Sequence, residues 1–463
     1  MLKKILSTCM LAAVLGSSYS QHQPRPFQKG DRIVFAGNSI TEAGFYLSYI
    51  WLYYMVHYPN SRIEVINGGV GGDVAEQIYR RLDGDLLPNK PSKLIVSFGM
   101  NDSKYFEYND KEHPMTEEKR AAIVETSYKS FQKIEDKLNK HPEISPIIMA
   151  SSPYDETVQQ KGDDFKGKAI TMSRIVDFQK KAAAKQNWAF VDLFHPMTAI
   201  NEKQQKKEPS YTSTGPDRIH PGSAGHFIMA YIFLKSQGLA GNPVADFTVN
   251  AKNKKVIKAE NCTVSNLQST GQTLSFDYLA KSLPFPYDTV ARAWGNDQVQ
   301  TDALKVIPFV RDFDQEILSV KGIASGKYIL KVDEVPLGTY SSDDLNKGIN
   351  LAMIKSAPAY RQALQIMDLN STRKNIEAKF RNYYWVQYDF LYDKGLLFNT
   401  TKAAEDTIQN NLEKNGWLKA KYDDYELVKN SSDSLKAEMK ALVDKIYTVN
   451  QPKNRHIELT RQS

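Results

Sequence analysis

The chain has 463 residues, of which 41% are hydrophobic and 24% are charged. These proportions are typical of a soluble globular protein, and the length predicts two or three domains. The net charge of +7 is spread over many lysines, which argues against a groove for nucleic acid. The sequence also carries no RNA-binding, zinc-finger or phosphate-loop signature, so we expect no nucleic-acid partner.

Residues 1–20 have the pattern of a cleavable signal peptide. Two lysines precede the apolar run Ile5–Leu15, small residues follow it, and Gln21 is the expected first residue of the mature protein. The run is too short for a membrane anchor, and no other stretch is long and apolar enough to be one. We therefore expect a secreted or periplasmic protein with no membrane span. Once the signal is removed Cys262 is the one cysteine left, so no intrachain disulfide is expected.

Short apolar runs alternate with amphipathic stretches over the first half, which we assign as one domain over residues 21–240. This alternation is typical of an α/β fold with a parallel sheet flanked by helices. The expected strands are Asp31–Gly37, Arg62–Asn67, Lys93–Phe98, Pro146–Ala150 and Ala189–Leu193.

Polar or glycine-rich residues lie at the junctions between these strands and helices. Ser39 follows the first strand, Gly68–Gly72 the second and Asn101 the third, while Asp217 and His220 precede the last helix of this half. Such junctions share one edge of an open parallel sheet, so we expect residues far apart in sequence to meet there. Asp73 is the expected N-cap of the helix after the glycine run.

The residues at this edge suit hydrolysis of an ester. Ser39 is the candidate nucleophile, His220 the base, and Asp217 the group that orients the imidazole. The backbone N–H groups of Ser39 and Gly72 and the side-chain amide of Asn101 are the candidate oxyanion donors. Each feature alone is more often part of a turn or a helix cap, but four together favour catalysis: Ser39, the glycine run, Asn101 and the pair of Asp217 and His220.

Four motifs resemble those of the SGNH hydrolases, also called the GDSL lipase/acylhydrolase family. They are Gly37–Thr41, Asn67–Asp73, Gly99–Asp102 and the Asp-x-x-His of Asp217–His220, within residues 30–237. The resemblance implies a three-layer α/β/α, flavodoxin-like fold with a five-stranded parallel sheet. It also implies an acyl-enzyme mechanism that uses no metal and no cofactor.

One residue departs from the family pattern, which has Asp before the nucleophile where this chain has Asn38. Asn keeps the shape and hydrogen-bonding reach but removes a charge beside Ser39. Because the residue is not the base, we expect activity to survive.

Aromatic residues near the motifs permit two interpretations. The stripe of Tyr46, Tyr49 and Tyr53 could stack on a sugar, but its helical spacing favours packing against the sheet. A second aromatic group, just after the motif Gly99–Asp102, consists of Tyr105, Phe106 and Tyr108. Its position suggests contact with substrate. His57 and His195 carry no motif and are assigned structural roles.

The second half lacks any catalytic spacing. Residues 241–345 predict a β-rich accessory module that includes a hairpin of Ile317–Val320 with Tyr328–Val332 and a third strand over Val335–Thr339. Residues 346–463 predict helices, with Ser431–Asp433 as a candidate cap. These regions could wall the cleft or bind glycan, or they could cover a sheet edge or a dimer interface. The sequence does not fix the oligomeric state.

The sequence therefore predicts a secreted serine esterase that removes short acyl groups, acetyl above all, from an oligo- or polysaccharide. One alternative is a lipase or lysophospholipase of the same fold. Another is a glycan-binding protein whose hydrolase site is silent.

Overall fold

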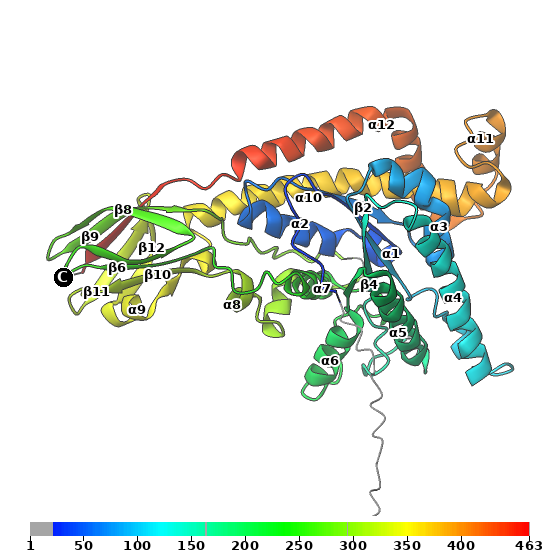
Figure 1. Ribbon diagram of the computed structural model, residues 1–463, viewed down its shortest axis with the longest axis horizontal. Helices are drawn as coiled ribbons and strands as arrows, with labels where there is room; N and C mark the ends of the chain where they lie inside the picture. The colour runs from blue at the N-terminus through cyan, green and yellow to red at the C-terminus, as the bar shows by residue number, and fades with distance from the viewer. Residues whose placement is uncertain (1–21, 163, 294, 463) are drawn as a thin grey trace, which may run out of the picture.

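A five-stranded parallel sheet forms the centre of the N-terminal half (Figure 1). The computed structural model describes residues 22–162, 164–293 and 295–462, so the predicted signal peptide lies outside the described residues. The strand order is β2-β1-β3-β4-β5, and every predicted strand is present to within two residues at each end. The strands are β1 (Arg32–Gly37), β2 (Glu64–Gly69), β3 (Lys93–Phe98), β4 (Ser145–Ala150) and β5 (Ala189–Val191).

Helices cover both faces of this sheet and give the expected three-layer α/β/α fold. One layer contains α2 (Phe45–His57) and α7 (Ser223–Ser236), which pack on each other. In the other layer α3 contacts α4 and α4 contacts α5; their bounds are Ala75–Arg81, Glu117–Leu138 and Lys168–Gln186. The short helix α1 (Ser39–Glu42) follows β1, and α6 (Phe194–Gln205) contacts α7.

Helix α2 is apolar on every side, which is typical of a helix buried all round. Tyr46, Tyr49 and Tyr53 are all buried, and Tyr49 packs edge-on against Phe227 of α7. The prediction of a core role for this stripe is therefore confirmed, and a sugar cleft there is excluded. His57 is buried as well and stacks on Tyr53, with ring centroids 4.1 Å apart.

The β-rich module consists of two sheets that face each other. The first has the order β13-β10-β6-β7 and the second β12-β11-β14-β9-β8. Phe247 of β6 stacks on Tyr278 of β9 across the interface, with ring centroids 4.4 Å apart. The bounds are β6 Ala245–Asn250, β7 Lys255–Glu260, β8 Cys262–Ser269, β9 Thr273–Ala280, β10 Glu316–Lys321, β11 Lys327–Val332, β12 Val335–Ser341, β13 Ile349–Asn350 and β14 Arg455–Arg461.

The predicted hairpin in this module is wrong. Strand β10 pairs with β6 and β13 in the first sheet, whereas β11 pairs with β12 and β14 in the second. The turn after β10 thus carries the chain from one sheet to the other. The hairpin that does form joins β11 to β12, the strand expected as a third member.

The predicted helical region 346–463 ends in a strand that the sequence analysis did not identify. Strand β14 lies between β11 and β9 and pairs antiparallel with both. Ile457 and Leu459 are fully buried while the residues between and beside them are more exposed, so the alternation typical of a strand is present in the sequence.

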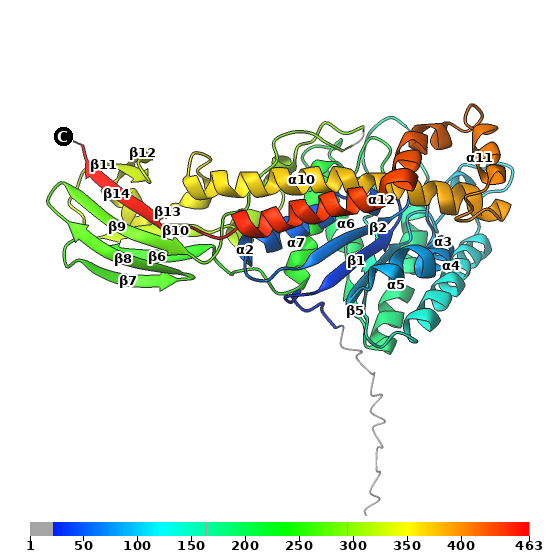
Figure 2. The same cartoon turned by 90° about the horizontal axis from the view of Figure 1, so that it is seen from above.

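Two long helices run side by side from the β module along the hydrolase domain (Figures 1 and 2). Helix α10 (Pro358–Trp385) packs on α2 and on the edge strand β2, and α12 (Gly416–Val449) packs on α10. Helix α12 begins at an Asn415 cap, and the non-helical backbone of Ser431 (φ −137°, ψ 19°) divides it into two helices across a kink. A helix boundary therefore lies at Ser431–Asp433, the segment that the sequence predicts as a cap. The shorter elements are α8 (Phe309–Phe313), α9 (Ser342–Lys347), α11 (Lys402–Gln409), the π turns η1 (Leu82–Leu86) and η6 (Val386–Leu391), and the 3-10 turns η2 (Leu87–Asn89), η3 (Phe106–Tyr108), η4 (Gln300–Lys305), η5 (Leu351–Met353) and η7 (Tyr392–Lys394).

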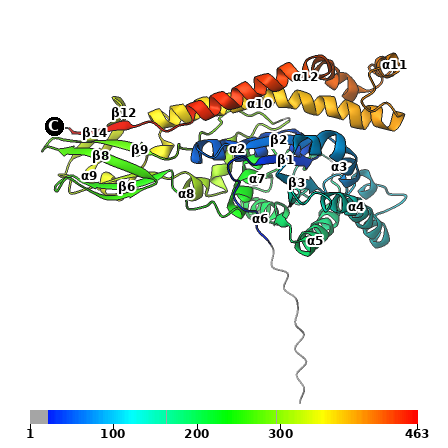
Figure 3. The same ribbon diagram turned by 45° about the horizontal axis from the view of Figure 1, so that its top comes forward.

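One hydrophobic core continues from the hydrolase domain into the β module. Figure 3 shows the two parts next to each other. Phe227 of α7 contacts Phe285 and Phe309, and Phe309 contacts Phe313. A backbone hydrogen bond also joins the two parts at this junction: the N–H of Leu283 donates to the carbonyl of Val56 at 2.8 Å. Among the described residues, no helix is both long and apolar enough to cross a membrane.

Asp314 is a fully buried carboxyl at this junction. It accepts hydrogen bonds from the N–H of Phe285 at 2.9 Å and the hydroxyl of Tyr287 at 2.7 Å. Burial raises its pKa to about 8. The folded protein therefore binds one proton more than the unfolded chain between the ordinary carboxyl pKa and this value, so stability falls as pH rises through that window.

Asp314→Asn should remove this penalty. The free energy of unfolding of the wild type should fall relative to the variant by up to about 1.4 kcal/mol per pH unit between about pH 5 and about pH 8. Urea unfolding at a series of pH values measures the difference, with Asp343→Asn on the exposed first turn of α9 as the control. Parallel pH curves for wild type and Asp314→Asn would contradict the assignment.

Candidate active site

Ser39, His220 and Asp217 lie in mutual contact, as the sequence analysis predicted. The hydroxyl of Ser39 is 2.8 Å from Nε2 of His220, and Nδ1 of His220 is 2.5 Å from Oδ2 of Asp217. Ser39 is the first residue of α1, directly after β1. The side chain of Asn38 is buried, and its Oδ1 accepts the N–H of Ile40 at 3.1 Å, which starts that helix.

The loop before α7 holds Asp217 and His220 in this arrangement. Oδ1 of Asp217 accepts the backbone N–H groups of Ile219 and His220, both at 2.9 Å. Arg218 between them has φ +63° and a buried guanidinium that donates to the carbonyls of Val158 and Gln160 at 2.9 and 3.0 Å. The side chain of Arg218 thus anchors the loop to the rest of the domain.

The charge of Asp217 fixes the tautomer of the imidazole. Burial alone raises the pKa of this carboxyl, but the hydrogen bonds and charge of His220 outweigh it, so the net pKa lies below the ordinary value. An ionised carboxylate can only accept, so Nδ1 of His220 carries the proton that it donates to Asp217. Nε2 therefore presents its lone pair to the Ser39 hydroxyl.

The predicted oxyanion donors lie at the ends of neighbouring strands. Gly72 is exposed and has φ +90°, a conformation that favours glycine. Nδ2 of Asn101 donates to the backbone carbonyl of Asp73 at 2.9 Å, and Oδ1 accepts from the hydroxyl of Tyr105 at 2.6 Å. These partners fix which end of the amide is nitrogen, and an amide NH2 has a second N–H to offer.

Asp73 does not cap helix α3, so that prediction is wrong. The residue before the helix is Val74, and its N–H is accepted by Oε1 of Gln77 at 3.0 Å. The Asp73 carboxylate turns inward instead, where Arg81 binds it. The buried guanidinium of Arg81 needs a carboxylate partner, and this need outweighs the stabilisation that Asp73 would give as a helix cap.

Lys168 at the start of α5 supports the third motif, and no sequence signal identified it. Its buried ammonium donates to the carbonyl of Met100 and the hydroxyl of Ser103, both at 2.6 Å, and to the carbonyl of Lys104. The same nitrogen lies 3.8 Å from the centroid of the Tyr105 ring. A lysine in an apolar helix face carries no motif, so this role emerges only from the fold.

The aromatic residues after the third motif have different roles. The Tyr105 hydroxyl binds Asn101, whereas that of Tyr108 donates to the carbonyl of Ser103 at 2.8 Å and so packs within the loop. Phe106 is 77% exposed, which leaves its ring available to a ligand. His195 pairs with Asp192 at 2.8 Å on the surface, away from these motifs in the chain.

Residues from the second half lie against the elements that carry the site. The ammonium of Lys374 on α10 lies 4.3 Å from the centroid of the Phe45 ring at the start of α2. Lys421 on α12 pairs with Glu42 of α1 at 2.8 Å. Arg292 donates its N–H to the hydroxyl of Ser223, the first residue of α7, at 3.2 Å. Within the described ranges no cluster of three or more His, Cys, Asp or Glu side chains could hold a metal ion.

Comparison with known proteins gives two family matches. Residues 35–228 match the GDSL-like lipase/acylhydrolase family, and residues 364–451 match the diltiazem deacetylase C-terminal helical domain. The first match contains Ser39, Gly72, Asn101, Asp217 and His220. The second covers most of α10 and α12.

Two individual proteins are similar to the chain. A solved structure described as a gut microbial diltiazem-metabolizing enzyme has 45% sequence identity and a TM-score of 0.92, over 95% of this chain and 99% of that one. An acetylxylan esterase of Geobacillus stearothermophilus is 26% identical over 226 residues, which are 45% of this chain and 94% of that protein. The family match over the motifs, together with the relative that covers nearly the whole chain, shows that this protein belongs to the GDSL-like lipase/acylhydrolase family of SGNH hydrolases and is a carboxylic ester hydrolase.

Proposed function

We propose that the protein is a secreted or periplasmic serine esterase that removes acetyl groups from carbohydrate through an acyl-enzyme. The observation that carries the proposal is the contact between the Ser39 hydroxyl and Nε2 of His220, at 2.8 Å, with Asp217 on the far side of the imidazole. A hydroxyl beside an oriented base is the arrangement that nucleophilic catalysis needs. The N-terminal pattern of residues 1–20 supports export.

In the acylation step Ser39 Oγ bonds to the carbonyl carbon of the ester as its proton passes to Nε2 of His220. The imidazolium is stabilised by Asp217, and the carbonyl oxygen becomes an anion. His220 then gives its proton to the departing alcohol oxygen as the C–O bond breaks, which leaves acetyl on Ser39. In the second half water attacks the acyl carbon as one of its protons passes to Nε2 of His220. The bond between that carbon and Ser39 Oγ then breaks, His220 returns the proton to Oγ, and acetate leaves.

The anion formed in each half reaction is assigned to three donors: the N–H groups of Ser39 and Gly72 and the second N–H of Asn101. Asn101 is suited to this because its other N–H and its oxygen already have partners, so the amide cannot rotate freely. Donors held in place before the reaction lose little energy to reorganisation, and each is worth roughly 3–4 kcal/mol of the barrier.

The substrate class rests on relatives and on the rim of the site. The acetylxylan esterase and the diltiazem deacetylase domain family, which the chain resembles, are both named for enzymes that remove acetyl groups. The exposed ring of Phe106 lies near Asn101 in the chain and offers a face on which a sugar ring could stack.

A second candidate is deacetylation of a compact aromatic molecule. It is favoured by the 45% identity to a diltiazem-metabolizing enzyme over nearly the whole of both chains, which includes the helical region. This candidate shares the mechanism and differs in the alcohol that leaves.

Ser39→Ala should abolish hydrolysis of an aryl acetate. Loss of the nucleophile typically lowers kcat by roughly 10⁴–10⁶-fold. Steady-state kinetics with 4-nitrophenyl acetate measure the loss, and Ser434→Ala, at an exposed serine of α12, is the control. A fluorophosphonate probe should label the wild type and not Ser39→Ala. Hydrolysis that persists in Ser39→Ala, or a wild type that the probe does not label, would refute the assigned nucleophile and favour a silent site.

Acyl and alcohol preference should separate the candidate substrates. For an acetyl esterase, kcat/KM for an aryl acetate should exceed that for the aryl octanoate by about tenfold or more. The reverse order would indicate a lipase. Acetate release from acetylated xylo-oligosaccharide is then compared with release from diltiazem. A strong preference for diltiazem would replace carbohydrate by the second candidate.

Asn38→Asp should keep the fold because Oδ1 can still accept the N–H of Ile40, whereas Asn38→Ala should lose about 1 kcal/mol of stability with that cap. The added carboxylate beside Ser39 favours the imidazolium, so the acid limb of the kcat/KM profile should move to higher pH. Thermal unfolding and pH-rate profiles test both points. An unchanged acid limb would show that the charge at position 38 does not reach His220.

A further inference from the structure

We propose that the C-terminal helical region holds the oxyanion loop in its catalytic position, and that Arg381 of α10 is a positioning residue for this purpose. The oxyanion loop is defined as residues Val70–Asp73. The proposal rests on the proposed roles of Gly72 and Asn101. It depends on a chain of buried charged side chains that runs from α10 to the loop.

The chain begins at Asp73, which follows Gly72. The backbone carbonyl of Asp73 accepts Nδ2 of Asn101 at 2.9 Å, so one residue fixes both predicted donors. Its carboxylate accepts Nε and Nη2 of Arg81 at 2.9 and 2.6 Å. Nη2 also donates to the carbonyl of Gly68 at 2.9 Å. The guanidinium therefore ties the end of β2 to the loop.

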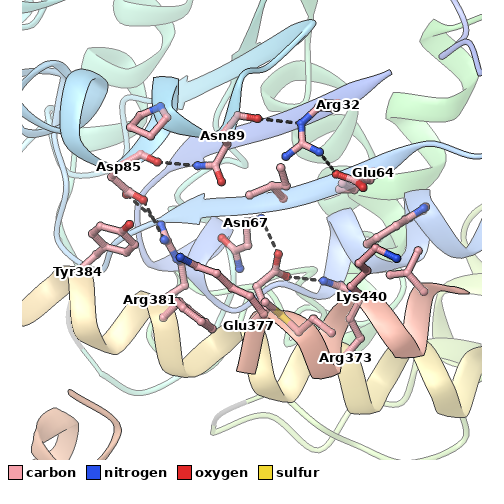
Figure 4. A pocket seen from close by; sticks show the side chains of 18 of the residues that line it. Arg32, Glu64, Asn67, Asp85, Asn89, Arg373, Glu377, Arg381, Tyr384 and Lys440 are labelled. Carbon is pink, nitrogen blue, oxygen red and sulfur yellow. Dashed lines mark hydrogen bonds and ion pairs between the residues drawn. The ribbon is translucent and has the colours of Figure 1, made fainter. Parts of the chain in front are cut away.

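The next links lead to the second half of the chain. Nη1 of Arg81 pairs with Oδ2 of Asp85 in η1, and both oxygens of Asp85 accept Arg381 of α10, at 3.0 and 2.9 Å. Figure 4 shows Arg381 reaching from α10 to Asp85 at the wall of a cavity of ≈ 360 Å³ between β2 and the helices. The pair is separated by 296 residues in sequence.

All four side chains are almost fully buried, so the charges cannot be compensated by water. Exposed fractions are 0% for Asp73 and Arg81, 1% for Asp85 and 4% for Arg381. Two carboxylates face two guanidinium groups, and removal of one member leaves a buried charge without balance. Burial alone lowers the pKa of Arg81, but Asp73 and Asp85 outweigh it and hold that pKa above its ordinary value. Without Arg381, Arg81 would be the remaining partner of both the Asp73 and the Asp85 carboxylates, and its hydrogen bonds to Asp73 would weaken.

Two further contacts from the helical region lie beside the same loop. Lys421 of α12 pairs with Glu42, whose other carboxylate oxygen lies 2.6 Å from the position that a Cβ on Gly71 would occupy. Asp389 of η6 accepts Nε2 of Gln77, the side chain whose oxygen binds the N–H of Val74. Three separate contacts therefore connect the helical region to the oxyanion loop or to residues that flank it.

The test compares Arg381→Met with Arg381→Lys and with Arg361→Ala, an exposed arginine on the same helix. Arg381→Met should lower kcat for an aryl acetate by roughly 10–100-fold with little change in KM, since the loop donors act in the transition state. The acid limb of the pH profile should not move, because Asp217 and His220 keep their contact. Arg381→Lys should recover part of kcat, and Arg361→Ala should match the wild type.

A double-mutant cycle with Asn101→Ala asks whether Arg381 acts through the oxyanion donors. If it does, the factor by which Arg381→Met lowers kcat should be clearly smaller in the Asn101→Ala background than in the wild type, because the Gly72 donor alone remains to be disturbed. Lys421→Met is the second variant should Arg381→Met fail to fold, and it should show the same pattern to a smaller degree. Circular dichroism and thermal unfolding confirm that each assayed variant is folded.

The outcomes separate the two proposals. Wild-type rates in Ser39→Ala and Asn101→Ala would overturn the proposed function. Losses in those two variants beside wild-type kcat in folded Arg381→Met, or effects that multiply in the double variant, would overturn the positioning role alone. A changed KM or a shifted acid limb in Arg381→Met would also count against it.

Discussion

A single buried guanidinium, that of Arg81, joins the parts on which the site depends. It binds the Asp73 carboxylate beside the glycine-rich loop, the carbonyl at the end of β2 and a second carboxylate in η1. Arg81 also donates to the carbonyl of Gly37 at 3.5 Å. The carbonyl of Asp73 accepts Asn101, so three motifs that are separate in sequence are connected through Arg81 and Asp73. The cost of burying its charge is met by two carboxylates and by backbone carbonyls, which explains why Asp73 points inward and does not cap a helix.

The second half of the chain is physically continuous with the hydrolase domain. An aromatic cluster around Phe227 and Phe309 continues the core into the β module, and α10 covers the edge strand β2. An exposed edge strand invites pairing with other chains, so a covering helix protects it. The same helix supplies Arg381, which binds Asp85 in η1, and Lys374, which lies beside Phe45 of α2.

Much of the first domain follows from sequence because its signals are local. Near-continuous apolar runs mark the strands, and the motifs fall at their ends, so the contact between Ser39 and His220 is predictable from topology alone. Lys168, Arg81 and Arg381 are not predictable in this way, since a buried charge is recognised only through partners distant in sequence. The hairpin of β10 with β11 fails for a related reason: each run has a strand pattern, but the pattern does not say which sheet it joins. Strand β14 has such a pattern too, but its 7 residues are a weak signal next to the 34 residues of α12 that precede it.

The placement of β14 has a consequence for how the molecule is assembled. The polypeptide leaves the sandwich after β13, travels out along α10, returns along α12 and re-enters the sandwich as its final strand, between β11 and β9. The paired helices are thus an excursion whose two ends are fastened in the same sandwich. The second sheet therefore has a gap between β11 and β9 until Arg455–Arg461 pair there, so the pairing of β14 also fixes both ends of the helical arm to one sandwich.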